Sequence, residues 1–522
     1  MLKNYLLIAF RNLSKHKAFS FINIVGLAIG MAACLLILQY VSFELSFDNF
    51  HAKKDRIYRI NQDRYNNGKL STQWAGGAFA PGSTFKAALP EIEDFVKIVG
   101  ADRVLANYKD QKMAITNDYY ASESFFNIFS FPLISGDPKT ALKEPNTVVI
   151  SEEVAQKLFH HIDPVGQSLT INNDKLLKIT GVMKNVPANS HMKFDFLQSY
   201  NTFLKENPPN KDFNVDNAWL NDGCKTYVLL KPGVDPKVLE GKFIPIVKKV
   251  YDAYKSAGEG AVYTLQSVQS IHLYSNRMIE FQPNGDGKSV YLLLGIAIFV
   301  IIIAWINYIN LATARGIGRA KEVGVRKTLG SAKGQLITQF MLEAMLLNGL
   351  AIILAVVFIL ICLPVFSRVS GLQMEFSMFT KPIFWGSMLG IFVLGSFFSG
   401  FYPAIVLSSF RPVEVMKGKI LASPRGVVLR KAMVVFQFAA SIFLLIGSST
   451  VFRQLKFMQN QKLGLKIDQT LIIKPPLNKI DSFYRDMSAF KQESLRQSVV
   501  KSITVSSSIP GEPIGWNAGG LN

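Results

Sequence analysis

Five long stretches of the chain contain no charged side chain. They lie at residues 18–43, 289–314, 344–367, 383–410 and 432–452. Each reaches the roughly 20 apolar residues that a helix needs to cross a bilayer. The pattern therefore predicts five transmembrane helices. The fourth contains Pro403 near its end, where a membrane helix tolerates proline.

The polar segments between these stretches differ greatly in length. Residues 44–288 are numerous enough for one large domain or two small ones. The others are the leading segment 1–17, the connections 315–343, 368–382 and 411–431, and the end 453–522. A chain that is 49% hydrophobic, with a mean hydropathy of +0.22, fits this mixture of membrane helices and soluble parts. The end 453–522, which closes on the Gly- and Pro-rich PGEPIGWNAGGLN, does not have the pattern of a finished domain, so we expect either a flexible end or a fragment of something longer.

Basic residues are unevenly distributed among the short segments. Residues 1–18 carry four Lys or Arg and no acid, and 315–343 and 411–431 carry six each, against two acids and one. The loop 368–382 has only two. Because Lys and Arg accumulate in cytoplasmic loops, the first three segments are predicted to be cytoplasmic and residues 44–288 external. The protein is expected to cross its membrane several times, with a cytoplasmic N-terminus.

This distribution also explains the formal net charge of +20. More than half of it lies in the three predicted cytoplasmic segments, where it follows from topology. Aromatic residues do not alternate with basic ones in any compact patch, so the composition gives no reason to expect nucleic acid as a partner.

The external segment has the pattern of a mixed α/β domain. Residues 147–151, 168–172 and 176–183 have the β-branched content of strands. Between the first two, EEVAQKLF places apolar residues at helical spacing. A later segment, GCKTYVLLKPGVDPKVLEGKFIPIVKKV, predicts a strand, a turn and a helix. Repeated strand–helix–strand units indicate small split βαβ modules.

A search for chemistry in this segment finds no catalytic or metal-binding constellation. His160 and His161 are adjacent and fit a solvated helix end, and the other histidines, including His51, His191 and His272, have no partner at ligand spacing. Residues 285–289, GDGKS, resemble the end of a phosphate-binding loop, but Gln282 stands where that loop needs glycine. We therefore expect no enzyme activity, catalytic residue, metal site or cofactor in this chain.

The most informative segment is RAKEVGVRKTLGSAK, at residues 319–333. It carries five basic residues and one acid between two predicted spans, so we expect a short helix along the cytoplasmic membrane surface. Glu322 precedes Arg326 by four residues, a favourable helical pair. Such a segment suits either docking of a soluble partner or attachment to anionic lipid headgroups.

The same segment resembles the cytoplasmic loop of the MacB/FtsX-like ABC transporter permeases, which transmit motion. The residues that fill that pattern are Arg319, Lys321, Glu322, Val323, Gly324, Val325, Arg326, Gly330 and Ser331, and Glu343 matches a further acid. The stretches LLIAFRNLSKHKAFSFINIVGLAIGMA, VVISEEVAQKLF, DPVGQSL and GVMKNVPANSH are similar to other parts of the family. The segment from Lys431 to Phe452 is similar to the start of a duplicated permease half.

The resemblance implies an α-helical bundle in a bacterial inner membrane with a MacB-like periplasmic core domain. It also implies that residues 453–522 begin a second periplasmic domain that this chain does not complete. It implies a permease subunit that works with a separate cytoplasmic ATPase dimer, which would bind ATP and Mg²⁺. The residues named above other than Ser331, together with Lys327, would form its coupling site, with Gly324 and Gly330 allowing close backbone approach. Further expected partners are a second permease or the duplicated half, a periplasmic adaptor or outer-membrane component, and membrane lipids.

The resemblance does not identify the cargo. Lipoproteins, peptides and hydrophobic compounds are all compatible with export or extraction by such a permease. The alternative is a membrane-anchored sensor, or an activator of a periplasmic partner without transport. A secondary transporter is disfavoured because the spans lack the ionisable residues that ion-coupled carriers place at mid-bilayer.

Overall fold

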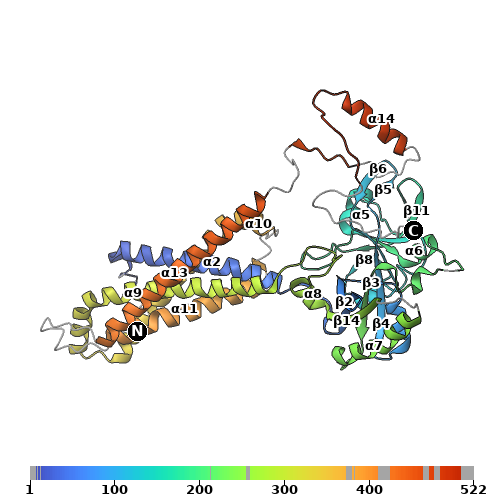
Figure 1. Ribbon diagram of the computed structural model, residues 1–522. Coiled ribbons are helices and arrows are strands. Elements are labelled where there is room, and N and C mark those ends of the chain that lie inside the picture. The colour runs from blue at the N-terminus through green and yellow to red at the C-terminus, as the bar shows by residue number, and fades with distance from the viewer. Residues whose placement is uncertain are drawn as a thin grey trace. The chain divides into compact units, whose positions relative to one another are not determined.

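The structure is a computed structural model of the chain. It describes residues 8, 10–11, 13–211, 213–253, 259–371, 379–380, 382–408, 424–461, 469–474 and 483–506. The chain divides into two compact units. The first comprises residues 1–55, 187–191 and 266–470, and the second comprises 56–186, 192–265 and 471–522. Figure 1 shows long helices in the first unit and a sheet with short helices in the second.

Five long helices make up most of the first unit. They are α2 (Lys17–Glu44), α9 (Gly287–Thr328), α10 (Lys333–Ser370), α11 (Pro382–Ser408) and α13 (Pro424–Gln459), with the short α8 (Val268–Tyr274) before α9. All five are long and apolar enough to cross a membrane. The prediction of a membrane protein with a helical bundle and a large α/β domain is confirmed.

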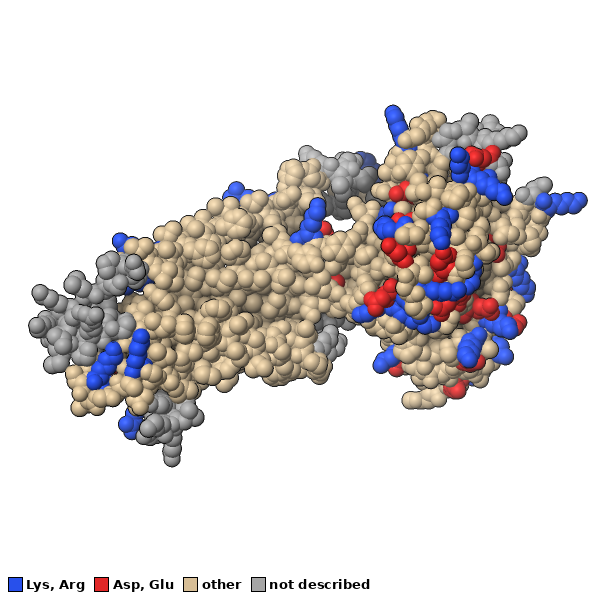
Figure 2. Space-filling view, turned by 90° about the horizontal axis from the view of Figure 1, so that it is seen from below, with Lys and Arg blue, Asp and Glu red and all other residues tan. Residues whose placement is uncertain are grey.

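The bundle core lies where α2, α9, α10 and α11 meet. α2 packs on α9 and α10, and α11 packs on α10 and α9, while α13 contacts α9. Small residues bring α2 and α9 together, since a Cβ atom on Gly30 would lie 2.6 Å from Cβ of Ala304. Such small-residue contacts are typical of membrane helices, which cannot rely on the hydrophobic effect to associate in lipid. Figure 2 shows the bundle as a surface almost without charged side chains.

The structure corrects one expectation about the basic segment. We expected a separate short helix between the second and third spans. Instead α9 continues without a break from Gly287 to Thr328 and α10 already begins at Lys333, which leaves a four-residue connection. No proline or capping residue interrupts residues 315–328, so the helix simply extends beyond its apolar part.

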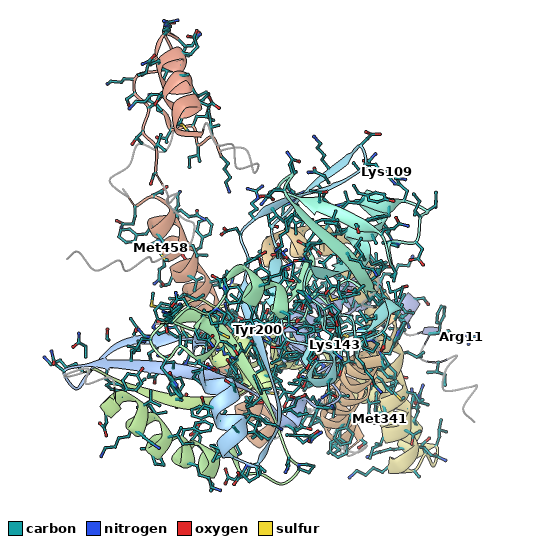
Figure 3. All side chains as sticks on the ribbon, turned by 90° about the vertical axis from the view of Figure 1, so that its right-hand side faces the viewer. Arg11, Lys109, Lys143, Tyr200, Met341 and Met458 are labelled. Carbon is teal, nitrogen blue, oxygen red and sulfur yellow. The ribbon has the colours of Figure 1, made fainter. Side chains whose placement is uncertain are left out.

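In the second unit the described residues form one mixed sheet of 14 strands. The strands are β1 (Ile57–Asn66), β2 (Lys69–Trp74), β3 (Gly77–Ala78), β4 (Ile92–Gly100), β5 (Val104–Tyr108), β6 (Gln111–Ile115), β7 (Asp118–Ala121), β8 (Leu133–Gly136), β9 (Thr147–Ser151), β10 (Ser168–Ile171), β11 (Lys175–Met183), β12 (Phe196–Ser199), β13 (Asp222–Leu230) and β14 (Glu259–Ser267). Their order is β14-β1-β13-β4-β7-β12-β9-β11-β10-β5-β6, with β2 beside β1, β3 beside β13 and β8 beside β11. The β5–β6 hairpin ends at Lys109, which projects from the sheet edge (Figure 3).

Helices cover this sheet at several points. They are α3 (Pro81–Ala88), α4 (Phe125–Ile128), α5 (Glu152–Phe159), α6 (Tyr200–Glu206) and α7 (Pro236–Ala253), and α14 (Phe483–Leu495) lies near the end of the chain. Separate hydrophobic cores result. One forms under α3 and α7 around Phe85 and Phe243, another under α5 around Phe159 and Ile179, and a smaller one around Phe79 and Tyr200. The sheet is therefore continuous while its core is divided.

The element predictions for this unit are largely confirmed. β9 and α5 begin and end where the sequence pattern places them, and β10, β11, β13 and α7 follow within a few residues. β9 and β11 pair in parallel, as a strand–helix–strand unit requires. His160 and His161 lie exposed at the end of α5, as expected.

Candidate functional site

The predicted coupling residues gather at the connection between α9 and α10, which we call the α9–α10 hairpin (residues 319–343). A complete Schellman turn ends α9: the N–H of Gly330 donates to the Lys327 carbonyl and that of Ser331 to the Arg326 carbonyl. Gly330 has φ +93°, and nothing lies within 4 Å of where its Cβ would be. The left-handed turn is therefore a sufficient reason for glycine at this position within the chain.

Apolar contacts hold the two arms of the hairpin together. Val323 is buried against Leu336 and Phe340 of α10 and Ala404 of α11. Gly324 is buried beside it. The hairpin is thus fixed to the end of α11 as well as to itself.

A chain of polar contacts reinforces this packing. Glu322 Oε1 lies 2.7 Å from Nη2 of Arg326, which confirms the predicted helical pair. Arg326 Nη1 also donates to Oε1 of the buried Gln339 (2.5 Å), and Gln339 Nε2 donates to Oε1 of Glu343 (3.3 Å). The planar guanidinium can serve both acceptors at once, whereas a lysine ammonium offers no such fork. Arg326 thereby ties the end of α9 to the start of α10.

Lys327 makes an equivalent contact with the third helix. Its Nζ donates to the Ser408 carbonyl at 2.6 Å, at the last residue of α11. A cation at a helix C-terminus satisfies an otherwise unpaired carbonyl and interacts favourably with the helix dipole. Arg326 and Lys327 therefore hold the hairpin rigid through contacts within the chain.

The exposed side of the hairpin is apolar at its tip. Val325 is 52% exposed and Leu329, one helical turn further on, is 81% exposed. Residues four apart lie on the same face of a helix, so the two side chains form one small apolar surface, which we call the tip. Arg319 and Lys321 lie in α9, but their side chains are outside the described part of the chain.

Sequence reasoning missed three members of this site. Gln339 and Ser408 are remote in sequence and carry no motif, so nothing in the pattern identified them as partners of Arg326 and Lys327. Leu329 did carry a signal. It is a large apolar residue within a basic segment whose position between two spans predicted exposure.

Nothing in the described residues forms a metal centre: no group of three or more His, Cys, Asp or Glu side chains is arranged to hold an ion. The GDGKS segment, residues 285–289, has a structural role. Asp286 caps α9 by accepting from the N–H groups of Lys288 and Ser289. The three cysteines are separate thiols, with Cys34 and Cys224 buried and Cys362 exposed.

Two family models match the chain. A MacB-like periplasmic core domain matches residues 20–245, and an FtsX-like permease C-terminal domain matches residues 294–412. The second match includes the whole α9–α10 hairpin. Neither matched domain is an ATPase domain.

Similar proteins include YknZ, an uncharacterized ABC transporter permease of Bacillus subtilis. It is 23% identical over 341 residues, which are 63% of this chain and 77% of that protein. The macrolide export ATP-binding/permease protein MacB of Neisseria meningitidis serogroup A is 24% identical over 235 residues, or 44% of this chain but 32% of that protein. The chain thus aligns with less than a third of that relative's length.

Among solved structures, the periplasmic region of MacB from Actinobacillus actinomycetemcomitans is 12% identical, with a TM-score of 0.27. The alignment covers 40% of this chain and 90% of that one.

Proposed function

This chain is an ABC transporter permease of the MacB/FtsX type, and we propose that it transmits the ATP-driven motion of a separate cytoplasmic ATPase dimer to its external domain. The observation that carries this proposal is the α9–α10 hairpin. Its apolar tip is exposed, and contacts among α9, α10 and α11 hold the rest of the hairpin rigid. A surface of that kind suits docking into a groove on a partner, because apolar side chains in such a groove leave water while the support resists bending.

The proposed sequence of events starts at the tip. Closure of the ATPase dimer around ATP and Mg²⁺ displaces the tip, and the Arg326–Gln339 contact makes α9 and α10 move together. Both helices pack directly on α2, so α2 follows. Because α2 and α9 are the helices that lead into and out of residues 45–286, their displacement reshapes the external domain.

Lipid attachment is the competing role for the basic segment. It would use free Lys and Arg side chains. Arg326 and Lys327 have acceptors within the chain, and the exposed face of the hairpin carries Val325 and Leu329. These contacts favour a protein partner over lipid headgroups.

The proposed cargo is a lipoprotein, a peptide or a hydrophobic compound, moved by export or extraction at a bacterial inner membrane. The name of one relative, the macrolide export protein of Neisseria meningitidis, supports export as the class of function. A second permease or duplicated half, a periplasmic adaptor and an outer-membrane component are the further proposed partners.

Substitution at the tip tests the proposal. The full chain is purified in mild detergent from its native host, and co-purifying proteins are identified by mass spectrometry. A soluble ATPase is expected in stoichiometric amount with the wild type. Leu329→Asp should weaken that association by about tenfold or more, since burying a charged group in an apolar contact costs well over 1.4 kcal/mol.

Val369→Asp is the matched control. Val369 is 82% exposed near the other end of α10, so the change is chemically the same at a site away from the tip. Equal ATPase recovery with both variants would rule out docking at the tip. Recovery of no ATPase with the wild type would remove the proposed function itself.

A further inference from the structure

Five residues of the external segment fold with the membrane helices. Pro187–His191 belongs to the first unit, although the chain runs on either side into β11 and β12 of the second. This segment, which we call the 187–191 strap, packs against the turn that follows α2. Its contacts there all lie within the first unit.

Asp48 is the centre of these contacts. Its side chain is fully buried, and its backbone adopts φ +57°, a left-handed conformation that Asp tolerates better than most residues. Oδ1 accepts from the Ser190 hydroxyl (3.4 Å) and from the His191 N–H (3.3 Å), while Oδ2 lies 2.8 Å from His191 Nδ1. The Asp48 N–H donates to the Asn189 carbonyl at 2.9 Å. One residue thus contacts three consecutive residues of the strap.

Two neighbouring contacts complete the attachment. Asn189 Nδ2 donates to the Ser46 carbonyl (2.9 Å) and lies 3.1 Å from the Ser46 hydroxyl. Gln282, just before α9, donates to the Ser190 carbonyl at 2.8 Å. The strap is therefore held both at the end of α2 and at the approach to α9.

The turn that holds the strap is itself fixed to the bundle. Glu44, the last residue of α2, lies 2.8 Å from His272 Nε2 of α8, and the His272 ring stacks on Phe47. Residues 44–48 are thus held by contacts with α8 and by contacts with the strap. A turn held in this way moves with α2.

His51 does not compete for the carboxylate as a second cation. Its Nε2 is 3.9 Å from Asp48 Oδ1, and burial lowers the pKa of His51 to about 4, against an opposing effect of Asp48. The ring is accordingly neutral at physiological pH. His51 therefore adds no positive charge beside the Asp48 carboxylate.

We propose that Asp48 is a positioning residue that fixes the 187–191 strap to the end of α2, so that β11 and β12 follow the movement of that helix. The inference rests on the proposed function and adds the segment through which movement of α2 reaches β11 and β12. Without the anchor, residues 184–195 would be an ordinary loop, which opens locally at low free-energy cost and absorbs displacement. Several contacts converge on one fully buried carboxylate and make the connection stiff, because polar contacts are stronger where water is excluded than in solvent.

The test uses the purified complex of the full chain with its co-purifying ATPase. Amide hydrogen exchange is compared without nucleotide and with ATP and vanadate. In the wild type we expect nucleotide to change exchange in the peptides that contain β11 and β12. In Asp48→Ala, ATP hydrolysis should persist, the nucleotide response of β11 and β12 should be lost, and exchange of strap amides should rise about tenfold or more.

Asp286→Ala is the matched control. It removes a capping carboxylate of the same unit that also accepts several hydrogen bonds, but these hold only the start of α9. This variant should keep the wild-type response in β11 and β12. If it loses the response as Asp48→Ala does, the effect is general destabilisation and the inference is overturned.

A disulfide in place of the Asp48 contacts distinguishes a detached strap from a general loss of folding. Cysteines at Ser46 and Asn189, whose side chains touch, are introduced into Asp48→Ala, with exposed Cys362 replaced by Ser. Oxidation should restore the nucleotide response and reduction should abolish it again. Failure of the pair to cross-link, or cross-linking without recovery, would contradict the assignment.

Two outcomes distinguish the role of the strap from the proposed function. A full nucleotide response in Asp48→Ala would overturn the role of the strap while leaving the proposed function intact. A wild-type complex whose external domain does not respond to ATP would overturn both.

Discussion

The carboxyl group of Asp118 shows how one buried residue makes the external domain sensitive to pH. It lies in β7 and accepts a hydrogen bond from Gln198 Nε2 at 2.7 Å, while its other oxygen is buried with no hydrogen-bond partner among the described residues. Burial raises the pKa of Asp118 to about 8, and the Gln198 hydrogen bond offsets only part of the effect. Asp118 is therefore mostly protonated in the folded domain at neutral pH, whereas the unfolded chain ionises near pH 4.

The difference in pKa between the folded and unfolded states determines how stability changes with pH. A pKa that is higher in the folded state contributes stability that is fully present below about pH 4 and is lost as pH rises through about 8. Asp118→Asn keeps an acceptor for Gln198 and cannot ionise. We expect it to raise the free energy of unfolding at pH 8 by about 1–3 kcal/mol relative to the wild type.

Thermal unfolding of the full chain, followed through the buried Trp219, measures this difference at pH 5 and pH 8. The two proteins should be closer at pH 5. An equal difference at both pH values would mean that Asp118 does not change its protonation state on unfolding.

Residue-scale contacts also show what the sequence could not reveal. His51, His191 and His272 look isolated along the chain, yet the structure places the first two at Asp48 and the third at Glu44. Asp48 and His191 are separated by more than a hundred residues, and only the tertiary fold brings them together. Pairs such as Glu322 and Arg326 were predictable because helical spacing alone determines their contact.

At the scale of elements, close packing of α2 on α9 is the contact through which motion is proposed to pass. Gly30 leaves no room for a side chain, since its Cβ would meet Cβ of Ala304 at 2.6 Å. Gly30→Val should push the helices apart and lower stability by about 1–3 kcal/mol, the usual cost of overpacking. The measurement is the unfolding temperature of the full chain in detergent.

Gly295→Val is the control for this variant. Gly295 also lies in α9, but nothing stands within 4 Å of its Cβ position. It should change the unfolding temperature much less than Gly30→Val. Similar losses in the two variants would indicate that only the β-branched side chain in a helix matters, and the packing argument would fail.

The elements themselves were predictable wherever one local signal determines them. Uncharged stretches located the five long helices, and β-branched runs with a following apolar helical pattern located β9 and α5. The pattern does not predict the unbroken α9, because the composition changes from apolar to basic in the middle of this helix. Composition reports the surroundings of a helix, whereas only caps, glycine and proline report its ends. Glycine alone does not decide, since α9 continues through Gly316, Gly318 and Gly324 and ends at Thr328, just before Gly330 with its φ of +93°.

At the scale of the whole molecule, the proposed mechanism requires the α9–α10 hairpin and the sheet unit to face opposite sides of the membrane. The excess of Lys and Arg in residues 315–343 predicts, by the positive-inside rule, that the hairpin is cytoplasmic. An odd number of spans separates the hairpin from residues 44–288 along the chain. Only in this orientation can a cytoplasmic ATPase reach Val325 and Leu329.

Single cysteines test this orientation. Lys109→Cys lies at the exposed tip of the β5–β6 hairpin and Ala332→Cys in the exposed turn before α10, each with Cys362 replaced by Ser. In spheroplasts, a membrane-impermeant maleimide should label Lys109→Cys and not Ala332→Cys, because a charged reagent cannot cross the apolar core. After detergent lysis both should react. Labelling of Ala332→Cys before lysis would invert the topology, and with it the route from a cytoplasmic ATPase through the hairpin to the strap.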